Sequence, residues 1–100
     1  FMYETGKGVL KDEVKAAEWY QRAATQGDAV AQSSLGRMFA AGRGVPKDYV
    51  RAYAWLNLAA AKNDANAATQ RDELETRMTV EQKAEAQELS AEIFARMTKK

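Results

Sequence analysis

The chain of 100 residues contains no cysteine, no histidine and a single proline. Without cysteine it can form no disulfide bond, and it offers neither a thiolate nucleophile nor a sulfur ligand for a metal. Without histidine it lacks the commonest metal ligand and the commonest general base near neutral pH. The remaining polar residues show no spacing typical of a nucleophile and its base. The sequence therefore predicts no cofactor, no metal site and no enzyme.

Long apolar runs and an excess of one charge are also missing. The most apolar stretch, Ala52 to Ala61, is interrupted by Asn57 and is much shorter than the ~20 residues that span a bilayer. The 15 Lys and Arg residues are interspersed with 14 Asp and Glu residues, for a net charge of +1. No basic stripe offers a surface for a phosphate backbone. We expect neither a membrane span nor a nucleic-acid partner.

Alanine dominates what is present, and β-branched residues are few. Alanine is the best helix former, and its small side chain lets helices approach closely, whereas sheets favour β-branched residues. Hydrophobic residues make up 46% of the chain, which is enough for a packed core. This composition predicts one globular all-α domain.

The main signal is an internal repeat. A shift of 36 residues places the first part of the chain on the next part without a gap, with these pairs among the identities: Met2 and Met38, Gly6 and Gly42, Gly8 and Gly44, Asp12 and Asp48, Trp19 and Trp55, Asp28 and Asp64. A period of this length is typical of solenoids built from pairs of helices.

Glycine and aspartate mark the helix ends that this repeat predicts. Each Gly-x-Gly segment, 6–8 and 42–44, is interpreted as a turn that ends a helix rather than as a phosphate-binding loop, which would need further glycines and a preceding strand. An aspartate at the start of a helix caps its free N–H groups. We therefore expect helices that begin at Asp12, Asp28, Asp48 and Asp64, with Gly27 and Asn63 closing the two tryptophan-bearing helices.

Helical spacing predicts which side chains face the core. The spacing places the following groups on inward faces: Ala16, Trp19, Tyr20 and Ala23; Ala31, Leu35, Met38 and Phe39; Ala52, Trp55, Leu56 and Ala59. The two tryptophans occupy the same repeat position, which favours core packing over ligand stacking for both. Gly36 is expected where a neighbouring backbone comes close.

The third copy of the repeat departs from the pattern. No Gly-x-Gly turn follows it, and Thr79 with Gln82 forms a capping box that predicts a helix over residues 80–97. Its predicted apolar face carries Val80, Ala84, Leu89, Ile93, Phe94 and Met97. Repeat arrays need an atypical end unit, so we interpret this helix as an internal cap. Membrane binding and self-association through this helix are the alternatives.

The segment from Ala31 to Ala60 follows one pattern, Ala-x3-Leu-Gly-x2-Phe-x2-Gly-x-Gly-Val-x2-Asp-x3-Ala-x2-Trp-x3-Ala-Ala. It resembles the Sel1-like repeat, a relative of the tetratricopeptide repeat. The resemblance implies a right-handed α-solenoid of antiparallel helix pairs with a C-terminal capping helix. We divide the chain into repeats over 1–78 (a partial unit 1–27, a complete unit 28–63 and a partial unit 64–78) and the capping helix 79–100. Because Phe1 to Tyr3 match the middle of a helix, further repeats are expected upstream.

The resemblance implies a function as a protein-binding scaffold, with a peptide or protein held on the concave surface formed by the first helix of each pair. The outward positions of those helices are the candidate partner-binding residues: Gln32, Ser33, Arg37, Thr69, Gln70 and Glu73. The alternatives are an accessory or regulatory repeat domain of an enzyme or cell-envelope assembly, and a structural module that self-associates by end stacking. The resemblance is compatible with a bacterial cytoplasm or periplasm and does not decide between them.

Overall fold

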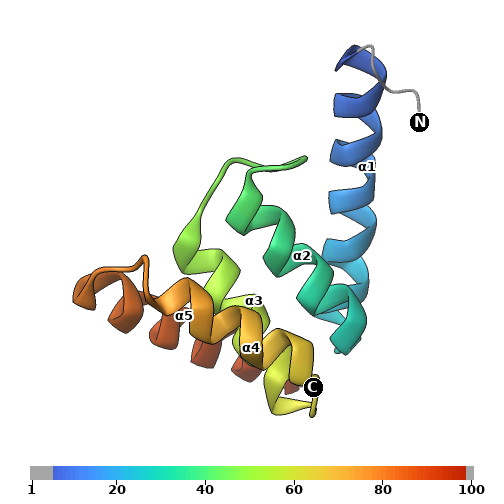
Figure 1. Ribbon diagram of the computed structural model, residues 1–100. Coiled ribbons are helices and arrows are strands. Elements are labelled where there is room, and N and C mark those ends of the chain that lie inside the picture. Colours follow the sequence, from blue (N-terminus) through green and yellow to red (C-terminus); the bar gives the residue numbers. More distant parts are fainter. Residues whose placement is uncertain (1–5, 99–100) are drawn as a thin grey trace.

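The computed structural model describes residues 6–98, with side chains from residue 12 onward. It contains five helices: α1 (Gly6–Thr25), α2 (Ala29–Ala41), α3 (Tyr49–Ala61), α4 (Ala65–Glu75) and α5 (Val80–Thr98) (Figure 1). No strand occurs between residues 6 and 98, so the predicted all-α class is confirmed. None of the helices in this range is long and apolar enough to cross a membrane.

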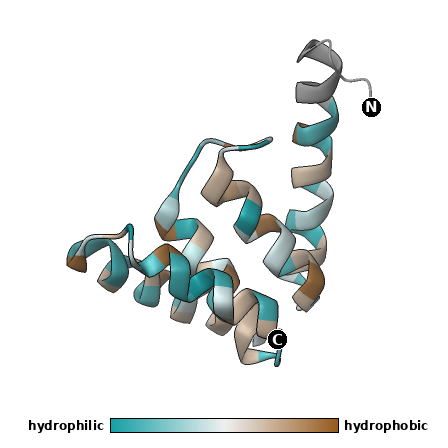
Figure 2. Cartoon of the chain, in the orientation of Figure 1, coloured by the Kyte–Doolittle hydropathy of each residue, from teal (hydrophilic) through white to brown (hydrophobic). Residues whose placement is uncertain are grey.

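Helix α3 lies at the centre of the molecule. Helices α2, α4 and α5 all pack against it, whereas α1 packs against α2. The free end of α1 projects away from the other helices (Figure 1). Successive helices from α1 to α4 therefore pack side by side, as expected for an α-solenoid, whereas α5 packs on α3 rather than on α4. Hydrophilic and apolar positions alternate along the helices (Figure 2).

Local sequence sets most of the helix ends. The side chains of Asp28, Asp48 and Asp64 each accept a hydrogen bond from the backbone N–H three residues later, at 3.0–3.1 Å. Gly27 and Asn63 both adopt positive φ angles, 97° and 71°, after α1 and α3. These conformations satisfy the backbone groups that a helix leaves free at its ends. The predicted starts at these three aspartates and the two predicted closures are confirmed.

The second Gly-x-Gly segment forms the predicted turn, and it packs on α1. Gly42 and Gly44 have φ angles of 71° and 78°. A Cβ atom on Gly44 would lie 2.3 Å from the backbone oxygen of Glu13, so only glycine fits there. Arg43 donates to the Glu13 carboxylate through Nη2 at 2.8 Å and Nε at 3.1 Å. These contacts fix the turn against the preceding unit.

The first Gly-x-Gly segment does not form a turn. Helix α1 begins at Gly6 and continues through Gly8 and Asp12, so the predicted turn over 6–8 and the predicted helix start at Asp12 are wrong. The second turn is held by the helix that precedes its unit, through Glu13. No described residue precedes Gly6 to support the first segment in the same way.

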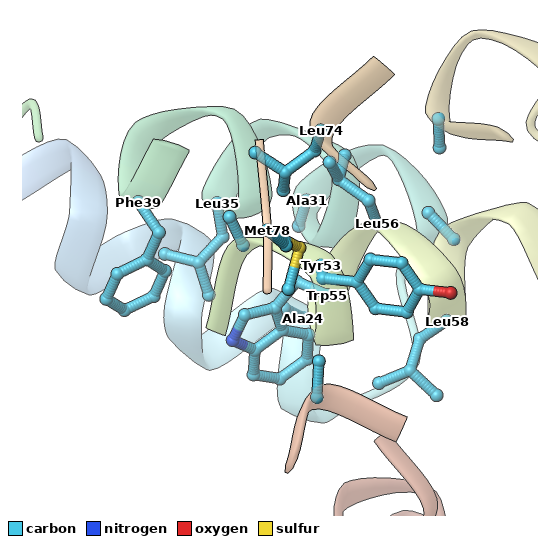
Figure 3. Packing of buried hydrophobic residues seen from close by; sticks show 14 residues of the cluster. Ala24, Ala31, Leu35, Phe39, Tyr53, Trp55, Leu56, Leu58, Leu74 and Met78 are labelled. Atoms are coloured by element: carbon cyan, nitrogen blue, oxygen red, sulfur yellow. The ribbon is translucent and has the colours of Figure 1, made fainter. Parts of the chain in front are cut away.

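The core is formed mainly by α2 and α3. Leu35 and Phe39 of α2 pack with Trp55 and Leu56 of α3, and each of these four side chains is at most 5% exposed; Figure 3 shows the cluster. A Cβ atom on Gly36 would lie 2.8 Å from Leu56 Cγ, so this glycine allows α3 to approach α2. The inward faces predicted for residues 28–41 and 48–62 are confirmed, except that Met38 is only half-buried.

Trp19 does not share the surroundings of Trp55. It is 67% exposed, with the guanidinium of Arg22 5.5 Å from its ring centroid, whereas Trp55 is 5% exposed. The buried face of α1 consists of Ala17 and Ala24, so the predicted face containing Trp19 and Tyr20 is wrong. Trp55 lies in a core cluster to which both α2 and α5 contribute. No described helix precedes α1 to cover Trp19.

The last helix begins as predicted, but its buried face is rotated. Thr79 and Gln82 exchange the two hydrogen bonds of the capping box, at 2.9 and 3.0 Å. Val80 and Phe94 are 75% and 53% exposed, and Ala84 is also exposed. The face that meets α3 is instead built from Ala86 and Ser90, with partly buried Leu89, Ile93 and Met97. Half of the predicted apolar face of α5 is therefore wrong.

Candidate protein-interaction surface

Helices α2 and α4, the first helices of two successive units, form the walls of a groove. The groove has a volume of about 360 Å³. Its lining comprises Arg37, Ala40 and Ala41 of α2, Leu56 of α3, Gln70, Glu73 and Leu74 of α4, and Arg77. Apolar side chains thus form the base of the groove, and charged side chains stand along its edges.

Two polar contacts hold α4 in place beside α3. Tyr53 of α3 donates a hydrogen bond to the Glu75 carboxylate at 2.8 Å. Arg71 donates to Asn57 at 3.0 Å, and Asn57 in turn donates to Ser90 of α5 at 3.0 Å. Burial, together with the bond to Glu75, raises the pKa of the Tyr53 hydroxyl above its ordinary value. The wall formed by α4 is therefore set by specific contacts as well as by apolar packing.

The polar groups along the groove are not equivalent. Arg37 and Arg77 are exposed, and Glu73 is the exposed carboxylate among the lining residues. Gln70 is half-buried, and its Oε1 atom is buried without a hydrogen-bond donor among the described residues. A buried acceptor that receives no hydrogen bond carries an unfavourable free energy of about 1–3 kcal/mol.

The structure brings together three of the six candidate partner-binding residues. Arg37, Gln70 and Glu73 line the groove between α2 and α4. Thr69 is exposed on α4 outside this lining, and its hydroxyl donates within the helix to the oxygen of Ala65.

Gln32 and Ser33 are corrected by the structure, because both are buried and neither is available to a partner. Gln32 is 0% exposed, and its Nε2 atom donates to the oxygen of Ala24 at 3.1 Å. Ser33 is 5% exposed, and its hydroxyl donates to the oxygen of Val30 at 3.2 Å. Their polar character suggested an outward position, but α1 packs on this part of α2.

The sequence analysis missed Arg77 and the small residues Ala40 and Ala41. Ala40 and Ala41 follow from helical spacing, since they lie three and four residues after Arg37 on α2. Arg77 lies in the turn after α4, where helical spacing does not apply. Leu56 was predicted as a core residue only, yet it forms part of the base of the groove. Its dual role depends on the gap between α2 and α4, which no local pattern specifies.

Comparison with known families accounts for the repeat and its geometry. The family model of the Sel1 repeat matches residues 1–28 and 29–64. The chain belongs to the Sel1 repeat family. Sel1 repeats are typically non-catalytic and commonly serve as protein-interaction modules.

A solved structure extends the comparison beyond the two matched repeats. The crystal structure of a protective antigen present in uropathogenic Escherichia coli strains, which displays an SLR fold, is 40% identical in sequence, with a TM-score of 0.80. The match covers 93% of this chain and 20% of that one, so the Sel1 chain described here spans about a fifth of its length. The matched region of this chain includes its C-terminal part, beyond the two Sel1 repeats. No curated protein sequence matches the chain.

Proposed function

We propose that this Sel1 chain is a protein-interaction module that holds a segment of a partner protein in the groove between α2 and α4. The observation that carries the proposal is the convergence of Arg37, Gln70 and Glu73 on one groove with an apolar base. A binding surface of this kind combines a small apolar centre with polar groups that fix orientation. The first helices of successive units supply both walls.

The dimensions and lining of the groove suit a peptide more than a small metabolite. Its base consists of small or aliphatic side chains, among them Ala40, Ala41 and Leu74, and its edges are open. An extended segment could place one apolar side chain on this base and leave its backbone beside Gln70.

The charges at the groove edges favour a segment that carries a carboxylate near Arg37 or Arg77. The lining carries two arginines and one glutamate, so the local charge of the lining is positive even though the whole chain is almost neutral. Arginine pairs with carboxylates through two parallel hydrogen bonds, which fixes orientation as well as position. These edge contacts would govern specificity and association rate more than affinity.

Photo-crosslinking would test the proposal directly. Because the chain has no cysteine, Thr69→Cys gives a single labelling site on α4, exposed one turn before Glu73, and leaves the arginines of the groove in place. Labelled with a photo-crosslinker and placed in extract of the source cells, it should capture a specific partner. Arg22→Cys, at an exposed residue of α1, is the matched control and should not capture that partner.

Two further variants separate the groove from the rest of the surface. Arg77→Glu, which would repel the carboxylate of the segment, and Gln70→Ala, both without the crosslinker, should weaken binding of the captured partner while the helical circular dichroism spectrum stays unchanged. Equal capture from both labelled positions, or binding that is unaffected by both substitutions, would contradict the proposal.

A further inference from the structure

A second groove lies among the helices that do not form the first one. It is lined by residues from α1, α3 and the C-terminal half of α5, and it has a volume of about 420 Å³. The two tryptophan-bearing helices α1 and α3 are equivalent in the repeat, yet α3 packs closely on α5 whereas α1 packs mainly on α2. The divergence of α1 from α3 leaves this groove open.

The floor of the second groove is apolar. It is formed by Trp55 of α3 together with Leu89, Ile93 and Met97 of α5. Trp55 is 5% exposed, and Ile93 packs against the core cluster. The floor is therefore an extension of the packed core.

The charged residues that line this groove are both arginines. Arg51 pairs with Asp48 at 3.4 Å, and its guanidinium lies 5.9 Å from the ring centroid of Phe39. With these contacts its side chain remains 58% exposed. Arg96 is exposed in the last turn of α5 and forms no ion pair with residues 12–98. The remaining polar lining residues, Gln21 and Thr25, are uncharged.

We propose that this second groove binds an acidic and apolar segment of a partner protein, with an apolar side chain on Trp55 and Ile93 and a carboxylate between Arg51 and Arg96. The charges of the lining select the carboxylate, and the apolar floor selects its neighbour in the segment. This site is separate from the groove between α2 and α4, and it does not depend on the function proposed for that groove.

The surface next to the groove gives the bound segment a direction. Toward the start of α5, a shallow hollow that shares Leu89 with the groove is lined by Glu85, Glu88 and Glu92. A carboxylate placed there would be repelled, so the acidic residues of the segment lie at the end nearest α1 and Arg96. Neutral or basic residues follow toward the start of α5. A segment with the opposite charge order would not fit.

The test uses Trp55 as a local reporter. Trp19→Phe leaves Trp55 as the only tryptophan, and it should not disturb the fold because Trp19 is 67% exposed. Short random peptides displayed on phage are selected on this variant of the chain. The proposal predicts binders that combine acidic with large apolar residues and that change Trp55 fluorescence on binding.

Charge reversal then locates the binders. Arg96→Glu should weaken their binding by about tenfold or more, because opposed like charges cost more than an exposed ion pair gains. Replacing the peptide carboxylate with lysine should restore binding to this variant. Arg51→Glu should act in the same direction, and Arg22→Glu, on α1 outside both grooves, should leave binding unchanged. Circular dichroism confirms that each variant is folded.

Three outcomes overturn the proposal. The first is that no peptide is selected. The second is that the selected peptides lack acidic residues or bind the Arg96→Glu variant equally well. The third is that Arg37→Glu, rather than Arg96→Glu, abolishes binding, which would place the peptides in the groove between α2 and α4. That third result would still agree with the function proposed for the first groove, so the two proposals fail separately.

Discussion

Replacing Gly36 with alanine is expected to destabilise the protein, although the same change stabilises most helices. In an isolated helix, alanine is more favourable than glycine by about 1 kcal/mol. At this position the new Cβ atom would lie 2.8 Å from Leu56 Cγ and 3.1 Å from the backbone oxygen of Ala52. Overpacking of this kind costs about 1–3 kcal/mol. Neither neighbour moves easily, since Leu56 is 1% exposed and the other contact is backbone.

The steric cost is therefore expected near the upper end of that range, and the net loss of stability is about 1–2 kcal/mol after the helix propensity is subtracted. Urea denaturation followed by circular dichroism measures this difference. Leu56→Ala provides the background that separates the two effects, because it removes the atoms that Gly36→Ala meets first. In that background Gly36→Ala should cost clearly less or become stabilising.

The double-mutant cycle should thus give a favourable coupling of about 1 kcal/mol or more between the two substitutions. Two results would refute the reasoning. One is stabilisation by Gly36→Ala in the parent chain, which would mean that α2 and α3 are not packed as closely as the structure has them. The other is an equal cost in both backgrounds, which would assign the effect to something other than contact with Leu56.

Three further predictions concern stability. Trp55→Ala should lower the free energy of unfolding by about 3–5 kcal/mol in urea denaturation, because the side chain is buried in the core. Trp19→Ala should lower it by only about 0.5–1 kcal/mol, the value of its contact with Arg22. Similar losses for the two variants would contradict the structure. Asp64→Ala should cost about 1 kcal/mol and Asp64→Asn much less, since asparagine can also cap α4; equal losses would argue against capping. The raised pKa of Tyr53 means that the folded state resists ionisation of this hydroxyl. Its contribution to stability is complete below the ordinary tyrosine pKa of 10.0 and is lost as pH rises through the folded-state value, so unfolding midpoints should fall above about pH 10 less steeply in Tyr53→Phe; an unchanged alkaline slope would contradict this assignment.

Features that depend on a few neighbouring residues were predicted well from the sequence. The caps at Asp28, Asp48 and Asp64 act through a hydrogen bond to the residue three positions later. The capping box at Thr79 and the left-handed closures after α1 and α3 are equally local. Such signals predict where helices begin and end without knowledge of what the helices touch.

Two of the errors share one cause, which is that repeat positions were assumed to have equal neighbours. Trp19 and Trp55 occupy the same position in the repeat, but only Trp55 follows a described helix of its own unit. The same reasoning failed for the turn at residues 6–8, because Glu13 supports only the second turn. The face of α5 was misjudged because Ser90, a polar residue, is buried by its bond with Asn57.

The sequence by itself determined the helical class, the repeat and its period, most of the helix ends, and the close contact at Gly36. These follow from backbone preferences and from spacing along the chain, both of which are local. The tertiary structure alone decided which side of α1 and α5 is buried, that Gln32 and Ser33 are buried, and where the grooves lie. These depend on the angles at which helices cross, and those angles are set by the sum of many small contacts between residues distant in sequence.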